Sequence, residues 1–460
     1  MSELIVGAAR ANITPPVGML MSGYAARKTP AIGVHDELNA VALYLSDGET
    51  EAGLITADLI GIDVQGTALI REACESICGV PAGNILVACS HTHGGPQTSL
   101  RRREDEDELK RAYSTVLIHK MAGALSEAKL RAKPVRVGYG RQDCLIALNR
   151  RERRPDGKTV LGVNPSGPIA PYTDVIRFDE IESGKTMALL FSYAAHGTTL
   201  GGDNLYYTAD YPGVAKRFIE SNLSNALALF VAACSADVNP YPRGNFELCE
   251  RHGIRLGCAV LQAAMGIDEM EEDLRIAVAR YEFALNLGEK PSLEEAREKL
   301  KRIRARAEEE IARARKAAGG KPVDEKDALS WFTARMLRGT EELVRDLEAG
   351  KADFTIPVET QAIAIGDYAI VGLPGEIFVN IGLKVAEESP FKVTIPVSHA
   401  NGAIGYVPTA DQVPLGGYEV EMARASRYGI FIAPESDRVM IEGALEALRR
   451  CYREVSHGQA

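Results

Sequence analysis

Short apolar runs that end at turn residues are the feature that most constrains the fold of this 460-residue chain. Such runs are typical of buried strands, and amphipathic stretches with apolar residues at three- and four-residue steps lie between them. This alternation predicts an α/β fold in which layered mixed β-sheets are flanked by helices. We expect strands at 41–44, 53–56, 85–89, 187–192, 228–233, 362–365 and 368–372. We expect helices at 65–78, 108–130, 213–223, 255–265 and 441–455.

Composition and charge narrow the class of function. Hydrophobic residues make up 46% of the chain and charged residues 25%, as in an ordinary globular protein. The formal net charge of -10 argues against a general affinity for nucleic acid or anionic lipid. No stretch approaches the roughly 20 apolar residues of a membrane span, and the first residues lack a signal-peptide pattern. We therefore expect a cytoplasmic protein that acts on a small molecule.

The eight cysteines are scattered without a CxxC spacing, so no thiolate zinc cluster is predicted.

The segment 268–350 differs from the rest of the chain in its charged, helical composition. Ser292 and Glu295 have the spacing of a capping box, and an apolar stripe follows until Gly319. A second helix is expected over 327–347. We interpret residues 1–460 as a single domain that carries this long helical hairpin as an insertion. The hairpin is either a solvated excursion packed on the body, or a lid or homo-oligomer contact.

A pair of histidines follows the apolar run 85–89. His91 and His93 are two residues apart, so in an extended chain both imidazoles face the same side. Histidine is the commonest nitrogen ligand of zinc, and the following glycines leave room for a substrate. The pair therefore indicates a metal site. Two histidines that make only structural hydrogen bonds are the alternative.

Two further residues occupy similar positions after apolar runs. His196 follows the run 187–193, and Glu376 follows the run 370–373 at a Pro-Gly break. A lone carboxylate there is costly to bury unless it is paired or bound to a metal. A catalytic zinc commonly takes three protein ligands, often including a carboxylate. The alternative for Glu376 is a carboxylate that caps a helix N-terminus.

Several motifs occur in the same order as in the neutral/alkaline, non-lysosomal ceramidase family. The chain resembles the N-terminal catalytic domain of that family over nearly its whole length, without the family's C-terminal β-sandwich. The motifs are Asn12-Ile13-Thr14-Pro15-Pro16, Gly23-Tyr24, Gly33-Val34-His35-Asp36, Ser90 to Pro96, Ala195-His196, Leu373-Pro374-Gly375-Glu376 and Asn401 to Tyr406. The resemblance implies a zinc-dependent amidohydrolase with one Zn2+ per chain. The implied metal ligands are His91, His196, Glu376 and Tyr406.

The same resemblance implies roles for three more residues. His93 corresponds to the residue beside the reacting water and would move protons or bind the tetrahedral intermediate. Arg150 corresponds to an arginine of the active-site cleft, where it would bind a carboxylate or an oxyanion; a plain salt bridge is the alternative. Asp210 corresponds to an acid that supports the metal ligands, and a helix or turn cap is its alternative.

One departure from the family concerns the substrate. The family's ceramidases carry a serine in a Gly-Asp-x-Ser-Pro stretch, and here the stretch reads Ala236-Asp237-Val238-Asn239-Pro240. Asn239 can donate and accept hydrogen bonds at this catalytic position but is not a nucleophile. This argues against true ceramide hydrolysis and leaves the metal chemistry intact.

The resulting prediction is a zinc-dependent hydrolase that cleaves a non-peptide C–N amide bond of a soluble small molecule through a metal-activated water. A zinc esterase or lactonase could use the same site. A non-catalytic binding protein of the same fold is another alternative, and a cysteine hydrolase that uses Cys89 or Cys234 is a third.

Overall fold

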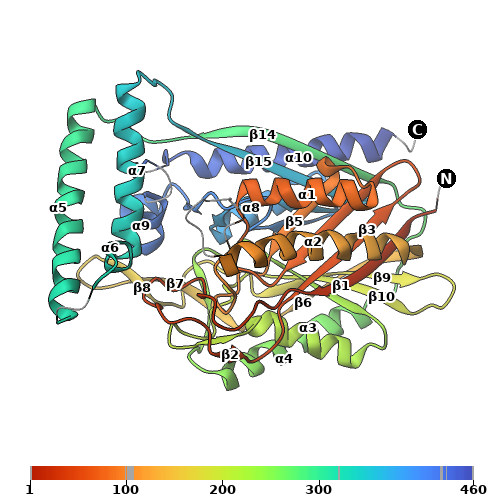
Figure 1. Cartoon of the computed structure of the whole chain (residues 1–460). Coiled ribbons are helices and arrows are strands. Elements are labelled where there is room, and N and C mark those ends of the chain that lie inside the picture. The colour runs from red at the N-terminus through yellow and green to blue at the C-terminus, as the bar shows by residue number, and fades with distance from the viewer. Residues whose placement is uncertain are drawn as a thin grey trace.

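Two β-sheets stacked face to face form the centre of the computed structural model, and helices cover their outer faces (Figure 1). The structure describes residues 3–98, 100, 108–319, 322–424, 428–430 and 432–457. The eight strands of the larger sheet lie in the order β12 (Leu227–Ala232), β10 (Thr186–Tyr193), β9 (Tyr172–Glu180), β6 (Lys133–Asp143), β1 (Ile5–Asn12), β3 (Asn39–Ser46), β4 (Glu51–Ala57) and β5 (Ile85–Cys89). The four strands of the smaller sheet are β14 (Ile276–Asn286), β15 (Thr355–Ile365), β16 (Tyr368–Gly372) and β18 (Val393–Val397).

Three smaller sheets lie at one end of the two main sheets. One joins β2 (Gly33–Val34) to β11 (Tyr206–Tyr207), and another joins β17 (Glu376–Ile377) to β19 (Tyr406–Val407). A three-stranded sheet contains β13 (Val238–Pro240), β7 (Ala147–Arg153) and β8 (Thr159–Asn164). These small sheets carry several of the residues predicted to form the site.

Side-chain alternation in the strands explains the layering. In β3, Leu43 and Leu45 point into the core between the two sheets, whereas Ala42 and Tyr44 point toward the helices. Both faces of this strand are buried, so its sequence is an almost continuous apolar run.

Helices lie on both outer faces of the stacked sheets. Those on the larger sheet are α1 (Val64–Cys78), α2 (Glu108–Leu130), α3 (Asp210–Asn222) and α4 (Phe246–Met265). Those on the smaller sheet are α8 (Val379–Glu388) and α10 (Ser436–His457). Short helical turns are η1 (Ala82–Asn84), α6 (Glu325–Ala328), η2 (Val413–Leu415) and α9 (Tyr418–Arg424). The predicted class, layered mixed sheets flanked by helices, is confirmed.

The predicted helical hairpin is present as α5 (Leu293–Ala317) and α7 (Trp331–Glu348), which stand as a pair at one side of the body (Figure 1). The Ser292–Glu295 capping box begins α5. Exposed ion pairs such as Arg304–Glu341 cross between the two helices. Ala296 and Leu343 face the core beneath the smaller sheet. The hairpin is thus packed on the body along an apolar stripe and charged on its outer side.

Several element boundaries differ from the prediction. The range 268–350 was expected to be a helical insertion, but β14 occupies Ile276–Asn286 within it and pairs with β15 along its whole length. Helix α4 begins at Phe246, well before the expected start at 255, because the Asn245 side chain accepts a hydrogen bond from Leu248 N at 2.8 Å and caps the helix. Among the described residues, no helix has the length and apolar character needed to cross a membrane.

Candidate metal centre

Three chain segments that follow buried strands meet at one end of the stacked sheets. His91 follows β5, His196 follows β10, and Glu376 follows β16. Each of these strands runs parallel to a neighbour, and the carboxyl ends of parallel strands form the edge at which open α/β sheets bind ligands. A bridge between Thr92 and Gly197 joins the first two loops. The fold therefore brings together side chains that lie far apart in the sequence.

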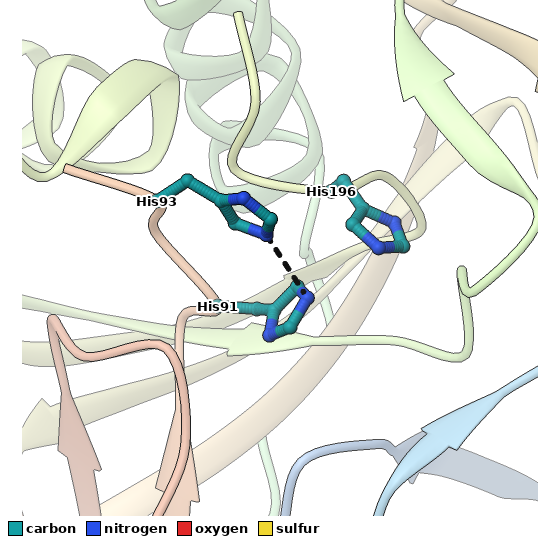
Figure 2. Close-up of side chains that lie close together, drawn as sticks. All are labelled: His91, His93 and His196. Carbon is teal, nitrogen blue, oxygen red and sulfur yellow. Dashed lines mark hydrogen bonds between the residues drawn. The ribbon is translucent and has the colours of Figure 1, made fainter. Parts of the chain in front are cut away.

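Main-chain carbonyl groups hold the rings of His91 and His196 in one orientation. Nδ1 of His91 lies 2.7 Å from Ile60 O, and Nδ1 of His196 lies 2.9 Å from Ser235 O. A carbonyl oxygen only accepts hydrogen bonds, so each Nδ1 carries the proton and each Nε2 keeps its lone pair. This arrangement is the one that metal-binding histidines usually adopt. Figure 2 shows both rings beside His93.

The Glu376 carboxylate faces both lone pairs. Its Oε2 lies 3.3 Å from His196 Nε2 and 3.6 Å from His91 Nε2. Burial lowers the pKa of His196 to about 4, so its ring is neutral at pH 7. Three acceptor atoms therefore face one another, an arrangement that a bound cation would stabilise.

The spacing of these atoms fits a zinc ion. Zinc binds nitrogen and oxygen at about 2.0–2.1 Å in a tetrahedron, which places neighbouring ligand atoms about 3.3 Å apart. The observed separations from Glu376 Oε2 are close to that value. Ring nitrogens of His91, His93 and His196 also lie within 4.8 Å of one another. The group can therefore hold a metal ion.

His93 belongs to the same group but is held differently. Its Nε2 lies 3.4 Å from His91 Nε2 (Figure 2), and its ring meets Tyr24 edge-on at 5.1 Å between centroids. A Cβ on Gly23, whose φ is +95°, would lie only 2.5 Å from the His93 ring, so that position requires glycine. Nδ1 of His93 has no hydrogen-bond partner in the described part of the chain. Burial lowers the pKa of His93 well below its usual value, so this ring is also neutral at pH 7.

Arg150 binds both Glu419 and Tyr406. From β7, its Nη2 donates to Tyr406 Oη at 3.1 Å and its Nε donates to Glu419 Oε1 at 2.7 Å. Burial raises the pKa of Tyr406, and Glu376 raises it further, so the phenol is neutral. The hydroxyl group thus accepts a hydrogen bond from Arg150, and Tyr406 is the register partner of Glu376 in the ladder of β17 and β19. Tyr406 belongs to the same cluster as the histidines.

Asn239 also contacts this arginine. Its Oδ1 accepts hydrogen bonds from Arg150 Nη1 and Thr198 Oγ1, each at 3.2 Å. β13, which carries Asn239, pairs with β7 beside Arg150, so the two side chains lie at the same edge. Seven of the eight site residues named from the sequence are therefore brought into one cluster.

Asp210 lies outside this cluster. Its carboxylate accepts hydrogen bonds from the main-chain N–H groups of Thr199 and Leu200 at 3.2 Å and of Tyr211 at 2.7 Å. It therefore caps the turn that follows His196, which is the alternative considered for it from the sequence.

Sequence reasoning missed His399 and Glu419. His399 follows β18, and its ring stacks on His91 with centroids 3.7 Å apart. The signal was present, because His399 follows an apolar run as His91 and His196 do. Glu419 lies in α9, where both of its carboxylate oxygens bind arginines, Arg150 and Arg151, at 2.7 Å. No local sequence pattern predicts that Glu419 pairs with these two arginines.

The two cysteines considered as nucleophiles are both unsuited to that role. Cys89 and Cys234 are buried, and burial raises the pKa of each thiol far above 7. A thiolate is the reactive form, so neither side chain is poised for attack.

A pocket of about 560 Å³ opens directly onto the cluster. His91, His93, Glu376 and Tyr406 are among the residues that line it. Its size is that of a small-molecule site.

A sequence model of the family described as "Neutral/alkaline non-lysosomal ceramidase, N-terminal" matches residues 4–262, more than half of the chain. The chain belongs to the neutral/alkaline non-lysosomal ceramidase family. The resemblance seen in the sequence motifs is thereby confirmed. A comparison with curated proteins gives no match.

Solved ceramidase structures share the fold. A ceramidase complexed with C2 superposes with a TM-score of 0.71 at 17% identity, over 98% of this chain and 76% of the other. The neutral ceramidase from Pseudomonas aeruginosa gives a TM-score of 0.70 at 17% identity, over 98% of this chain and 75% of the other. The fold shared with these ceramidases thus includes nearly the whole chain.

Proposed function

We propose that the protein is a zinc-dependent hydrolase that cleaves a non-peptide amide bond of a soluble small molecule. The observation that carries this proposal is the convergence of His91 Nε2, His196 Nε2 and Glu376 Oε2, three acceptors that a bound cation would stabilise. Membership of the ceramidase family supports amide hydrolysis as the reaction class. The pocket volume supports a small-molecule substrate.

In this proposal His91, His196, Glu376 and Tyr406 hold the ion. His91 and His196 are favoured over His93 as ligands because carbonyl groups anchor their second ring nitrogens, whereas Nδ1 of His93 lacks such a partner among the described residues. When bound, zinc would supply a Lewis acid that polarises a carbonyl and lowers the pKa of water.

The chain's own residues would perform the proton transfers. His93 is neutral and lines the pocket, so its Nε2 would accept a proton from the attacking water. As the C–N bond breaks, the same atom would return the proton to the leaving amine. The new C–O bond comes from water, so the products are a carboxylic acid and an amine.

Arg150 would stabilise the charge that develops on the carbonyl oxygen. It stays protonated, and its contacts to Glu419, Asn239 and Tyr406 fix the guanidinium in one position. A preorganised donor of this kind contributes about 3–4 kcal/mol in comparable sites. Asn239 would position Arg150 rather than act as a nucleophile.

The test compares matched amides and esters that share acyl and leaving groups. We expect amide hydrolysis that a chelator abolishes and that added zinc restores. His93→Ala should keep its zinc and lose about 10²–10⁴-fold in kcat. His119→Ala, an exposed histidine on α2, is the control and should behave as wild type. Hydrolysis that survives complete removal of metal would contradict the proposal.

A further inference from the structure

One imidazole of the pocket has no role in the reaction proposed above. His399 follows β18, is 5% exposed and lines the same pocket as His91 and Glu376. Its Nε2 is enclosed by other atoms and has no hydrogen-bond partner in the described part of the chain. Buried polar atoms are normally paired, so this nitrogen requires an explanation.

Main-chain hydrogen bonds set the position of this residue. His399 N donates to Gly375 O at 3.1 Å, and His399 O accepts from Cys89 N at 3.2 Å. The φ of His399 is +55°, in the left-handed region that favours glycine. The fold therefore holds His399 beside the metal centre in an unfavourable backbone conformation.

Stacking explains the ring of His399 but not its nitrogen. The ring lies parallel to that of His91, with centroids 3.7 Å apart and an interplanar angle of 10°. A phenyl ring would offer the same aromatic face without burying an unpaired polar atom, which costs free energy. Stacking on His91 is the purely structural role that His399 could have. The unpaired Nε2 indicates instead a ligand that enters the pocket.

The amide bond cleaved in the proposed reaction contains a group that needs such a partner. An amide is planar and trans, so its C=O and N–H groups point in opposite directions. Arg150, which contacts Tyr406 and Asn239, is assigned to the carbonyl oxygen. His399 packs instead on His91, so it approaches the cluster through a different residue. Its nitrogen can therefore serve the N–H group.

The chemistry of imidazole suits this partnership. Burial favours the neutral ring, in which one nitrogen accepts a hydrogen bond. An ester has an oxygen atom in place of the N–H group and cannot donate to that nitrogen. A buried acceptor thus discriminates against the ester, because the ester leaves the acceptor unpaired.

We propose that His399 is a specificity-determining residue whose Nε2 accepts a hydrogen bond from the N–H group of the scissile amide, so that the enzyme prefers amides to esters. No proton moves to His399 in this step, and His93 still returns the proton to the leaving amine. This inference rests on the proposed amide hydrolysis at the same site.

The test uses two substrates that differ in one group. N-propyloctanamide carries the N–H group, and propyl octanoate has an ester oxygen in its place; both release octanoate. His399→Phe keeps a ring that can stack on His91 and removes the acceptor. We expect this variant to lose about 10-fold in kcat/KM for the amide and to keep kcat/KM for the ester within about twofold. Its zinc content should equal that of wild type.

Two further variants complete the comparison. His399→Gln lacks the ring but keeps an acceptor in its amide oxygen, so it should recover part of the amide rate. His119→Phe, the same substitution at an exposed histidine of α2, should behave as wild type with both substrates. An equal loss for amide and ester in His399→Phe would leave His399 with the stacking role and overturn the inference. An unchanged amide rate in His399→Phe would also overturn it.

A binding measurement separates this inference from the proposed function. If the zinc-loaded wild-type protein cleaves neither compound, both are stable ligands that can be titrated into it by calorimetry. Tighter binding of the amide than of the ester, with the difference lost in His399→Phe and kept in His119→Phe, would support recognition of the N–H group without turnover. Equal binding of the two compounds, or binding of neither, would overturn it.

Discussion

Glu376 and Tyr406 are register partners in the parallel ladder of β17 and β19. Their side chains therefore leave the two strands side by side, and Tyr406 is held in place by Arg150 Nη2 at 3.1 Å. The chain uses a two-stranded ladder to place a carboxylate and a phenol at one point, although 30 residues separate them in the sequence.

Removal of the Tyr406 hydroxyl group should weaken metal binding. Tyr406→Phe keeps the buried ring and so should fold normally. We expect the zinc Kd, measured by competition with a chelator, to rise at least about 10-fold, the scale seen when a metal site loses a supporting contact. Tyr418→Phe is a suitable control, because Tyr418 lies next to Tyr406 at the pocket wall. Unchanged zinc affinity in Tyr406→Phe would remove Tyr406 from the ligand set.

Asn239 should matter for rate and not for metal binding. Asn239→Ala removes the acceptor for Arg150 Nη1, a loss of about 1–1.5 kcal/mol for one hydrogen bond, or about 10-fold in kcat. Asn239→Ser should recover part of this rate, because a hydroxyl group still accepts. Zinc content should stay at the wild-type level in both variants. A kcat for Asn239→Ala equal to that of wild type would show that Arg150 needs no such support.

Glu419 should be important for stability. Its carboxylate binds both Arg150 and Arg151 at 2.7 Å, and the three side chains are at most 6% exposed. Glu419→Gln leaves two buried cations without their counter-charge, which should lower the free energy of unfolding by about 3–5 kcal/mol. Urea denaturation measures this. Glu421→Gln, which alters an exposed pair with Arg424, should change stability by less than about 1 kcal/mol.

Asp237 should make stability depend on pH. Burial raises its pKa from 3.8 to about 6, even though Val379 N and the Asn149 side chain donate hydrogen bonds to its carboxylate. A raised pKa in the folded state means that the protonated form is favoured by folding. Its contribution is complete below pH 3.8 and is lost as the pH rises through about 6. The loss is about 3 kcal/mol at 1.36 kcal/mol for each unit.

Unfolding of wild type and Asp237→Asn between pH 4 and pH 7 tests this effect. The stability of wild type relative to the variant should decline across the range, because asparagine does not titrate. A constant difference would show that Asp237 keeps an ordinary pKa.

Local patterns in the sequence were sufficient to predict helices α1 to α5, α7 and α10 and seven of the strands, but β1, β6 and β9 of the larger sheet were missed. The strands before His91 and His196 end where the apolar runs end, and the capping box at Ser292 begins α5 as predicted. β14 was missed although Tyr281, Phe283 and Leu285 alternate with other residues in the period of a strand. The charged composition of the surrounding segment outweighed that signal.

Tertiary contacts could not be predicted in the same way. The pairing of Glu419 with Arg150 joins residues 269 apart, and no local spacing encodes it. The approach of Trp331 and Arg335 to the pocket depends on how the hairpin docks, which the helical stripe alone leaves undetermined. Roles assigned to the seven site residues stay predictions, and the variants at His93, Tyr406 and Asn239 test three of them.

The central claim is that a metal ion binds where His91, His196 and Glu376 converge, and its most direct test is the metal content of the purified protein. Elemental mass spectrometry of wild type, His196→Ala and the exposed-surface control His119→Ala should find about one zinc per chain in the first and third and a large loss in the second. Absence of bound metal in wild type after zinc is supplied, or equal zinc in His196→Ala, would contradict the account.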